Sequence, residues 1–143
     1  ALASTVESGM PVSAVEEAFI SLRSAATQAA EASRPTLKET LLAAARTLRQ
    51  AADEYNEGVK DGKVVNAKEY QDAYGFTGVV VERLASVEGA NEAEKAAVAV
   101  SREQAALALA IVPTVSPPAR PGGKASTIYG AATRIELAAL GLD

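Results

Sequence analysis

Apolar residues recur at steps of three and four positions along most of this chain, which is the spacing of one face of an α-helix. The pattern predicts five helices, over roughly residues 13–32, 36–58, 66–88, 91–111 and 126–140. In the first, the apolar stripe follows Val12, Val15, Phe19, Leu22, Ala26 and Ala29; in the fourth, it follows Ala93, Ala96 or Ala97, Val100, Leu107 and Ile111. Short connections between amphipathic helices favour antiparallel neighbours. We therefore predict an all-α protein, an antiparallel up-down four-helix bundle.

The starts of four of these helices carry residues that cap helix N-termini. A capping side chain stands three positions before a glutamate at Ser13–Glu16, Thr36–Glu39, Asn66–Glu69 and Asn91–Glu94. In a capping box, the cap side chain binds a backbone N–H in the first turn, and the glutamate binds back to the backbone N–H of the cap. These four starts define a predicted four-helix core over residues 12–111.

Prolines and glycines end the helical pattern after residue 111. The segment that cannot lie inside a helix contains Pro113, Pro117, Pro118, Pro121, Gly122 and Gly123. We predict a single helical domain over residues 1–143. Residues 112–124 are a Pro/Gly-rich linker, or strap, and residues 125–141 are a short fifth helix at the C-terminus.

The composition excludes several classes of function. The 143 residues include no Cys and no His, which removes zinc fingers, His-ligated haem and Ser-His-Asp catalysis. With no cofactor loop either, we predict that the protein is not an enzyme. The net charge is −4 and the basic residues are scattered, which argues against nucleic-acid binding. No apolar stretch reaches the roughly eighteen residues of a transmembrane segment.

The first three residues, Ala1-Leu2-Ala3, resemble the small-residue cleavage site of a signal peptide. On this interpretation the protein is exported and periplasmic. The alternative, a coincidence of small residues, stays open.

Residues able to bind a cation concentrate between the second and third predicted helices. Two Glu-Tyr pairs flank a turn built on Gly58 and Gly62, and their carboxylate and phenolate oxygens suit Fe(III), Ca(II) or Mn(II). The candidate metal ligands are Asp53, Glu54, Tyr55, Glu57, Asp61, Tyr70, Asp72 and Tyr74. An alternative also stays open, in which the tyrosines cap the core and Glu69 only caps its helix with Asn66.

The residues from Arg102 to Ala106 begin like the Arg-Glu-x-x-Glu motif of iron permeases, but Ala106 replaces the second glutamate. We interpret this stretch as a solvated helix face.

The run from Tyr55 to Asn66, followed by Glu69-Tyr70, resembles the extracytoplasmic helical region found with bacterial FTR1-family iron permeases. That region has a recurring tyrosine, a turn of the form V-x-D-G-x-V and an E-Y pair on the next helix. The resemblance implies a periplasmic helical domain that serves iron uptake. It implies no ligand positions, and a chain without membrane spans or an intact permease motif cannot itself conduct iron.

We therefore expect a non-enzymatic periplasmic domain that assists iron uptake through weak cation binding at this acidic, tyrosine-bearing corner. An iron ion is the expected cation, and a membrane iron permease or another periplasmic protein is the expected partner. In the alternative function, the chain is a structural or protein-interaction module without a metal site, which docks a partner through its alanine-rich faces or residues 113–123.

Overall fold

The computed structural model of the protein describes residues 8–143, without the side chains of residues 30–32. Its elements are α2 (Val12–Ser33), α3 (Leu37–Gly58), β1 (Val59–Lys60), β2 (Lys63–Val64), α4 (Ala67–Ala85), α5 (Glu92–Ile111) and α6 (Ala125–Leu140). The all-α prediction is confirmed, since the two strands form only a short hairpin. Residues 1–3, with their resemblance to a cleavage site, lie outside the described part.

The chain divides into two compact units, one ending at Pro35 and the other comprising residues 36–143, and each is described by itself. The assignment of residues 1–143 to one domain stays a prediction. In the first unit, α2 begins at Val12 after Pro11, which makes no side-chain capping hydrogen bond. The predicted capping box headed by Ser13 is therefore wrong, because Ser13 already lies inside the first helical turn. Arg34 ends the helix in a left-handed conformation, with φ of 41°.

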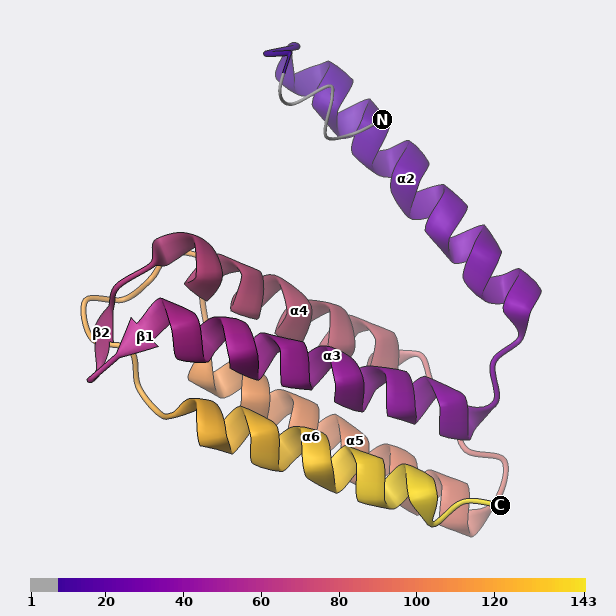
Figure 1. The fold of residues 1–143 in the computed structure, drawn as a ribbon. Helices are drawn as coiled ribbons and strands as arrows, with labels where there is room; N and C mark the ends of the chain where they lie inside the picture. The colour runs from indigo at the N-terminus through magenta and orange to yellow at the C-terminus, as the bar shows by residue number, and fades with distance from the viewer. Residues whose placement is uncertain (1–7) are drawn as a thin grey trace. The chain divides into compact units, whose positions relative to one another are not determined.

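In the second unit, α3, α4, α5 and α6 form a four-helix bundle, as predicted. Consecutive helices pack side by side, and α6 packs against α3 to complete the ring (Figure 1). The bundle differs from the expected core over residues 12–111, because the helix after the strap is its fourth member. Two fully buried isoleucines, Ile128 and Ile135, tie α6 into the common core. None of the helices in the described part of the chain is long and apolar enough to cross a membrane.

The apolar stripe of α3 faces the core of the bundle. The side chains buried on this face are Leu41, Ala44, Ala45, Leu48, Ala51, Ala52 and Tyr55. Because alanine side chains are short, this face lets α4 and α6 approach α3 closely. The cap of α3 is also as predicted: Thr36 Oγ1 accepts from the Glu39 N–H at 3.2 Å, and the Glu39 carboxylate accepts from the Thr36 N–H at 2.8 Å.

The predicted face of α5 is wrong in part, although Ala97 is buried and Ile111 packs against the core as expected. Val100 and Leu107 are 38% and 47% exposed, whereas Ser101 and Gln104 are buried beside three alanines and Val98. The alanines are distributed around α5, so the apolar pattern did not select one face. The polar Ser101 can turn inward because its hydroxyl donates to the Ala97 carbonyl at 2.7 Å.

Candidate functional site

The candidate site lies where α3 turns into α4. Val59 pairs with Val64 and Lys60 with Lys63, which leaves Asp61 and Gly62 as a two-residue loop. Both loop residues have positive φ, 50° and 69°, as the tight turns that match strand twist require. The predicted Gly-based turn is thus a β-hairpin of minimal length.

Gly58 sets the distance between the two helices at this corner. A Cβ atom at Gly58 would lie 2.7 Å from the Tyr70 backbone nitrogen and 3.1 Å from the Asn66 carbonyl oxygen. The backbone N–H groups of Val65 and Asn66 both donate to the Gly58 carbonyl, at 2.8 and 3.2 Å. The start of α4 therefore rests directly on the end of α3.

Tyr55 and Tyr70 meet inside the core. They are 2% and 0% exposed, and their ring centroids lie 6.1 Å apart. Burial raises the pKa of both phenols; the neighbouring Tyr70 adds to the rise at Tyr55, and the Thr114 side chain opposes the rise at Tyr70. The Tyr55 hydroxyl donates to the Gly122 carbonyl of the strap at 3.2 Å, whereas the Tyr70 hydroxyl lies near the Thr114 side chain but makes no hydrogen bond within residues 8–143.

These positions favour the alternative in which Tyr55 and Tyr70 pack in the core and are not metal ligands. A phenolate ligand would have to form against a raised pKa and away from solvent. Tyr74, one turn beyond Tyr70, is half-buried and packs against the same core.

Two carboxyl groups come together on the outer side of the corner. A hydrogen bond with the Glu54 side chain raises the pKa of Glu69; partial burial and the charges of Glu54 and Asp72 also raise it, and Lys68 opposes the rise. The Glu69 carboxylate also accepts from the Asn66 side chain at 3.3 Å. Glu69, expected only to cap its helix, thus also lies close enough to Glu54 for that carboxyl group to raise its pKa, while Glu54 itself accepts a hydrogen bond from the Gln50 side chain.

The two Glu-Tyr pairs contain the sequence signal for this contact. Tyr55 and Tyr70 face each other in the core. The glutamates that precede them in the sequence, Glu54 and Glu69, therefore lie close together at the edge of the core. The symmetric placement of the two pairs about the hairpin is therefore the pattern that could have revealed the contact between Glu54 and Glu69.

The other candidate acids point elsewhere. Asp53 accepts a hydrogen bond from the hydroxyl of Tyr129 on α6, which raises the pKa of that phenol. Glu57 is exposed, and Asp61 is exposed at the tip of the hairpin. Within residues 8–143, acidic side chains nowhere form a group of three that could hold a metal ion. The corner therefore offers a contacting pair, Glu54 and Glu69, with the charge of Asp72 nearby.

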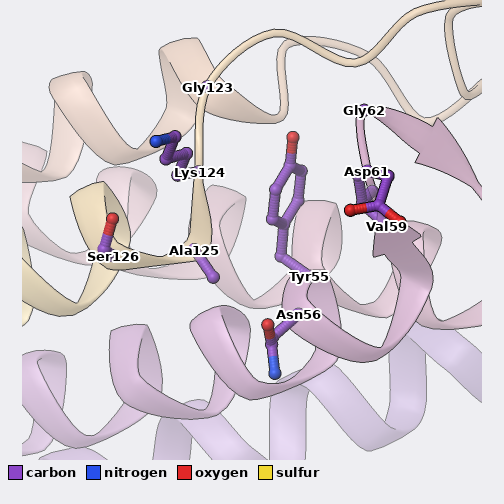
Figure 2. Close-up of a pocket in the computed structure, with 9 residues that line it drawn as sticks. All are labelled: Tyr55, Asn56, Val59, Asp61, Gly62, Gly123, Lys124, Ala125 and Ser126. Atoms are coloured by element: carbon purple, nitrogen blue, oxygen red, sulfur yellow. The ribbon is translucent and has the colours of Figure 1, made fainter.

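Asp61 instead faces a hollow of about 580 Å³ between the hairpin and the start of α6 (Figure 2). Its lining residues are Tyr55, Asn56, Val59, Asp61, Gly62, Gly123, Lys124, Ala125 and Ser126. One carboxylate and one ammonium group line this hollow, so it does not extend the acidic pair.

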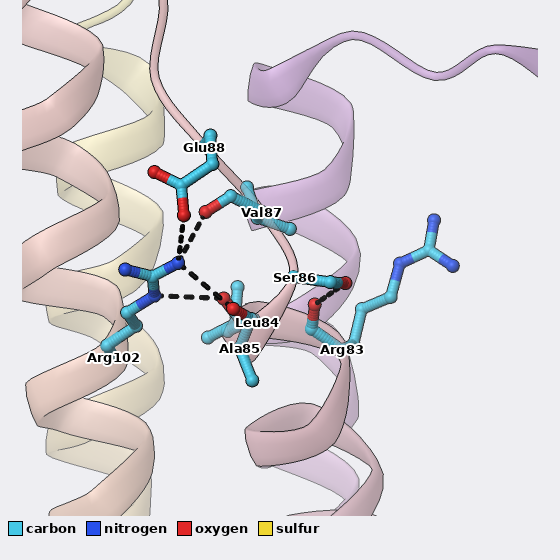
Figure 3. A network of polar contacts seen from close by, with 7 residues as sticks. All are labelled: Arg83, Leu84, Ala85, Ser86, Val87, Glu88 and Arg102. Atoms are coloured by element: carbon cyan, nitrogen blue, oxygen red, sulfur yellow. Dashed lines mark hydrogen bonds and ion pairs between the residues drawn. The ribbon is translucent and has the colours of Figure 1, made fainter.

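Arg102 does not belong to a solvated face, and that interpretation is wrong. Its guanidinium group donates to the carbonyls of Leu84 and Ala85 at the end of α4, at 3.0 and 3.1 Å, and to the carbonyl of Val87 in the connection that follows, at 2.7 Å (Figure 3). It also pairs with Glu88 at 3.0 Å. The last carbonyls of a helix lack intrahelical partners and carry partial negative charge, so this cation caps α4 from the neighbouring helix.

The fold and the corner define a class of small helical bundles whose first two helices are joined by a β-hairpin. Residues 30–139 match the family model of the iron permease-associated 4-helix bundle domain. This match covers more than three quarters of the chain, so the protein belongs to that family. No curated protein and no solved structure matches the chain.

Proposed function

We propose that this domain assists iron uptake outside the cytoplasm by holding iron weakly at the α3–α4 corner, beside a membrane permease. Membership of the iron permease-associated family is the observation that carries the link to iron uptake. The contact between Glu54 and Glu69 supports the choice of place within the domain.

The chemistry of the corner fits a cation that is held briefly. Two contacting carboxyl groups share a proton or repel each other, and a cation placed between them removes that repulsion. Carboxylate oxygens are hard ligands that suit iron, and the charge of Asp72 adds to the attraction. A site with so few protein ligands leaves water on the metal, which favours release to a partner over storage.

Proton competition follows from the same contact. Because the pKa of Glu69 is raised, a cation that binds there displaces a proton over a higher pH range than at an ordinary carboxylate. Iron affinity should therefore fall as the pH is lowered through the raised pKa of Glu69.

Titration calorimetry of the intact chain with Fe(II) under anaerobic conditions tests the proposal. The wild type should give a saturable binding isotherm, and the Glu54→Gln/Glu69→Gln double variant should lose at least about tenfold in affinity, because neutral amides remove both ligand charges. Glu103→Gln is the control, since Glu103 is exposed on α5 and lies outside the corner. Wild-type protein that binds no iron, or a double variant that binds as tightly as Glu103→Gln, would overturn the proposed site.

A further inference from the structure

Helix α2 carries a heptad seam that the proposed function does not use. Its apolar residues repeat every seven positions in two sets, Val12, Phe19 and Ala26 in one, and Val15, Leu22 and Ala29 in the other. This is the a and d pattern of a two-stranded coiled coil. Three of the four large side chains of the seam are exposed, Val12 by 74%, Phe19 by 51% and Leu22 by 55%, and Val15 is half-buried. The family match begins at residue 30, so most of α2 lies outside the family's bundle.

We propose that α2 is an interaction surface for a second copy of this chain, which packs antiparallel against it as a two-stranded coiled coil. The order of residues along the seam selects the direction. The large side chains lie in the first half and the alanines in the second, so antiparallel packing places Val12 against the partner's Ala29. By the same register, Phe19 meets the partner's Leu22 near the two-fold axis.

A parallel pair would fill the seam less well. It would place Phe19 against the partner's Phe19 and would leave consecutive layers made only of alanine. Layers that alternate large and small side chains interdigitate, whereas uneven layers leave voids or crowd. The antiparallel direction is therefore the one that fills every layer.

The charges beside the seam agree with this register. Glu16 and Arg23 each follow a d position and flank the apolar residues on the same side. In the antiparallel pair, Glu16 of one copy lies next to the partner's Arg23, and two-fold symmetry repeats this contact. Glu16 and Glu17 are adjacent, so the helix is not the basic amphipathic type that binds anionic membrane surfaces.

The mass of the intact chain in solution tests the association. Light scattering or sedimentation should show a concentration-dependent species of twice the 14.6 kDa chain mass. Phe19→Glu and Leu22→Glu should each weaken the association at least about tenfold, because each places a charge in the apolar seam. Ile20→Glu is the matched control, since Ile20 is 65% exposed and lies outside the seam, and it should associate like the wild type.

The direction and the charge contacts have their own tests. The chain has no cysteine, so Val12→Cys and Ala29→Cys can be introduced without side reactions. Under oxidation, a mixture of the two variants should form a disulfide between copies, and neither variant alone should. Arg23→Glu should weaken the association, and the added change Glu16→Arg should restore it.

A chain that stays monomeric at all concentrations overturns the proposal, as does equal association of the Phe19→Glu and Ile20→Glu variants. Cross-linking of Val12→Cys with itself overturns the antiparallel direction. None of these changes touches the α3–α4 corner, so iron binding and self-association can fail independently.

Discussion

Gly58→Ala should destabilise the bundle by about 1–2 kcal/mol, because the end of α3 has no room for a methyl group. The new Cβ would lie 2.7 Å from the Tyr70 nitrogen and 3.2 Å from the Glu69 carbonyl carbon. Ordinary contacts begin near 3.4 Å, so the start of α4 would have to move by several tenths of an ångström. Both contacted atoms are backbone, and no side-chain rotation relieves the clash.

The magnitude combines two opposing effects. Crowding in a packed region costs about 1–3 kcal/mol, whereas replacing a helical glycine by alanine gains up to about 1 kcal/mol. Gly58 does not have positive φ, so conformational strain adds nothing to the cost. Gly75→Ala is the matched control: a Cβ there meets no atom within 4 Å, and the substitution should stabilise α4 by about 0.5–1 kcal/mol.

Denaturant unfolding followed by far-ultraviolet circular dichroism measures both changes. The two substitutions are chemically identical, so opposite signs would show that the local contact decides the outcome. If Gly58→Ala is as stable as the wild type or more stable, α3 and α4 do not approach each other this closely. The same variant should also weaken iron binding, because it displaces Glu69 from Glu54.

Three further changes test other parts of the structure. Arg102→Ala should destabilise the protein by about 2 kcal/mol, because several charge-assisted hydrogen bonds to the end of α4 are lost. The control Arg83→Ala, at the same helix end, should cost less than about 0.5 kcal/mol. Equal effects of the two variants in chemical denaturation would contradict the capping role of Arg102. Tyr55→Phe should destabilise the protein by about 1 kcal/mol, because it removes the hydrogen bond to the strap. Tyr70→Phe should be neutral or stabilising, because the Tyr70 hydroxyl makes no hydrogen bond within residues 8–143. Thermal unfolding of the two variants would show the reverse order of stability if these assignments were wrong. Because the pKa of Glu69 is raised, the folded state binds the Glu69 proton more tightly than the unfolded state does. The stability that this proton contributes is fully present below the ordinary carboxyl pKa and is lost as the pH rises through the raised pKa of Glu69. Glu69→Gln should remove this contribution from the pH dependence of the unfolding free energy, and an unchanged pH profile would refute it.

Local signals in the sequence predicted local structure in part: Asn66 and Asn91 cap their helices as expected, but of the four predicted capping boxes only the one at Thr36 has both reciprocal hydrogen bonds. The Thr36–Glu39 box has the expected reciprocal hydrogen bonds, and the Gly-based turn before Asn66 is a hairpin because Asp61 and Gly62 both accept positive φ. Capping and tight turns depend on residues within four positions of each other. Such interactions can therefore be predicted directly from the sequence.

The apolar pattern failed to predict the buried face where alanine residues occur on all sides of a helix, because the faces then differ little in hydrophobicity. In α5 the larger residues Val100 and Leu107 were assigned to the core, yet they are exposed, and the smaller Ser101 and Gln104 are buried. The role of Arg102 was missed for a related reason. Its partners are carbonyl groups on a different helix, and no spacing along one helix reveals which of its residues reaches a neighbouring helix end.

The sequence predicted where the candidate site lies, but it did not predict which acidic residues lie together there. The carboxylates expected to act together lie on α3, in the hairpin loop and on α4, with Asp53 bound to Tyr129 of α6 and Asp61 at the hairpin tip. Glu69 was set aside because it also serves Asn66, although one carboxylate has two oxygens and can serve both a cap and a neighbour. Deciding between these roles required the side-chain positions.

Paramagnetic broadening of backbone amide signals by Mn(II), used as a stand-in for Fe(II), tests the central claim most directly. In a nuclear magnetic resonance titration of the intact chain, the signals of Glu54, Glu69 and Asp72 should broaden first, at substoichiometric Mn(II), and the Glu54→Gln/Glu69→Gln variant should abolish the effect. Broadening centred on Asp61 and the hollow beside α6, or spread evenly over the surface acids, would contradict a cation site at the α3–α4 corner.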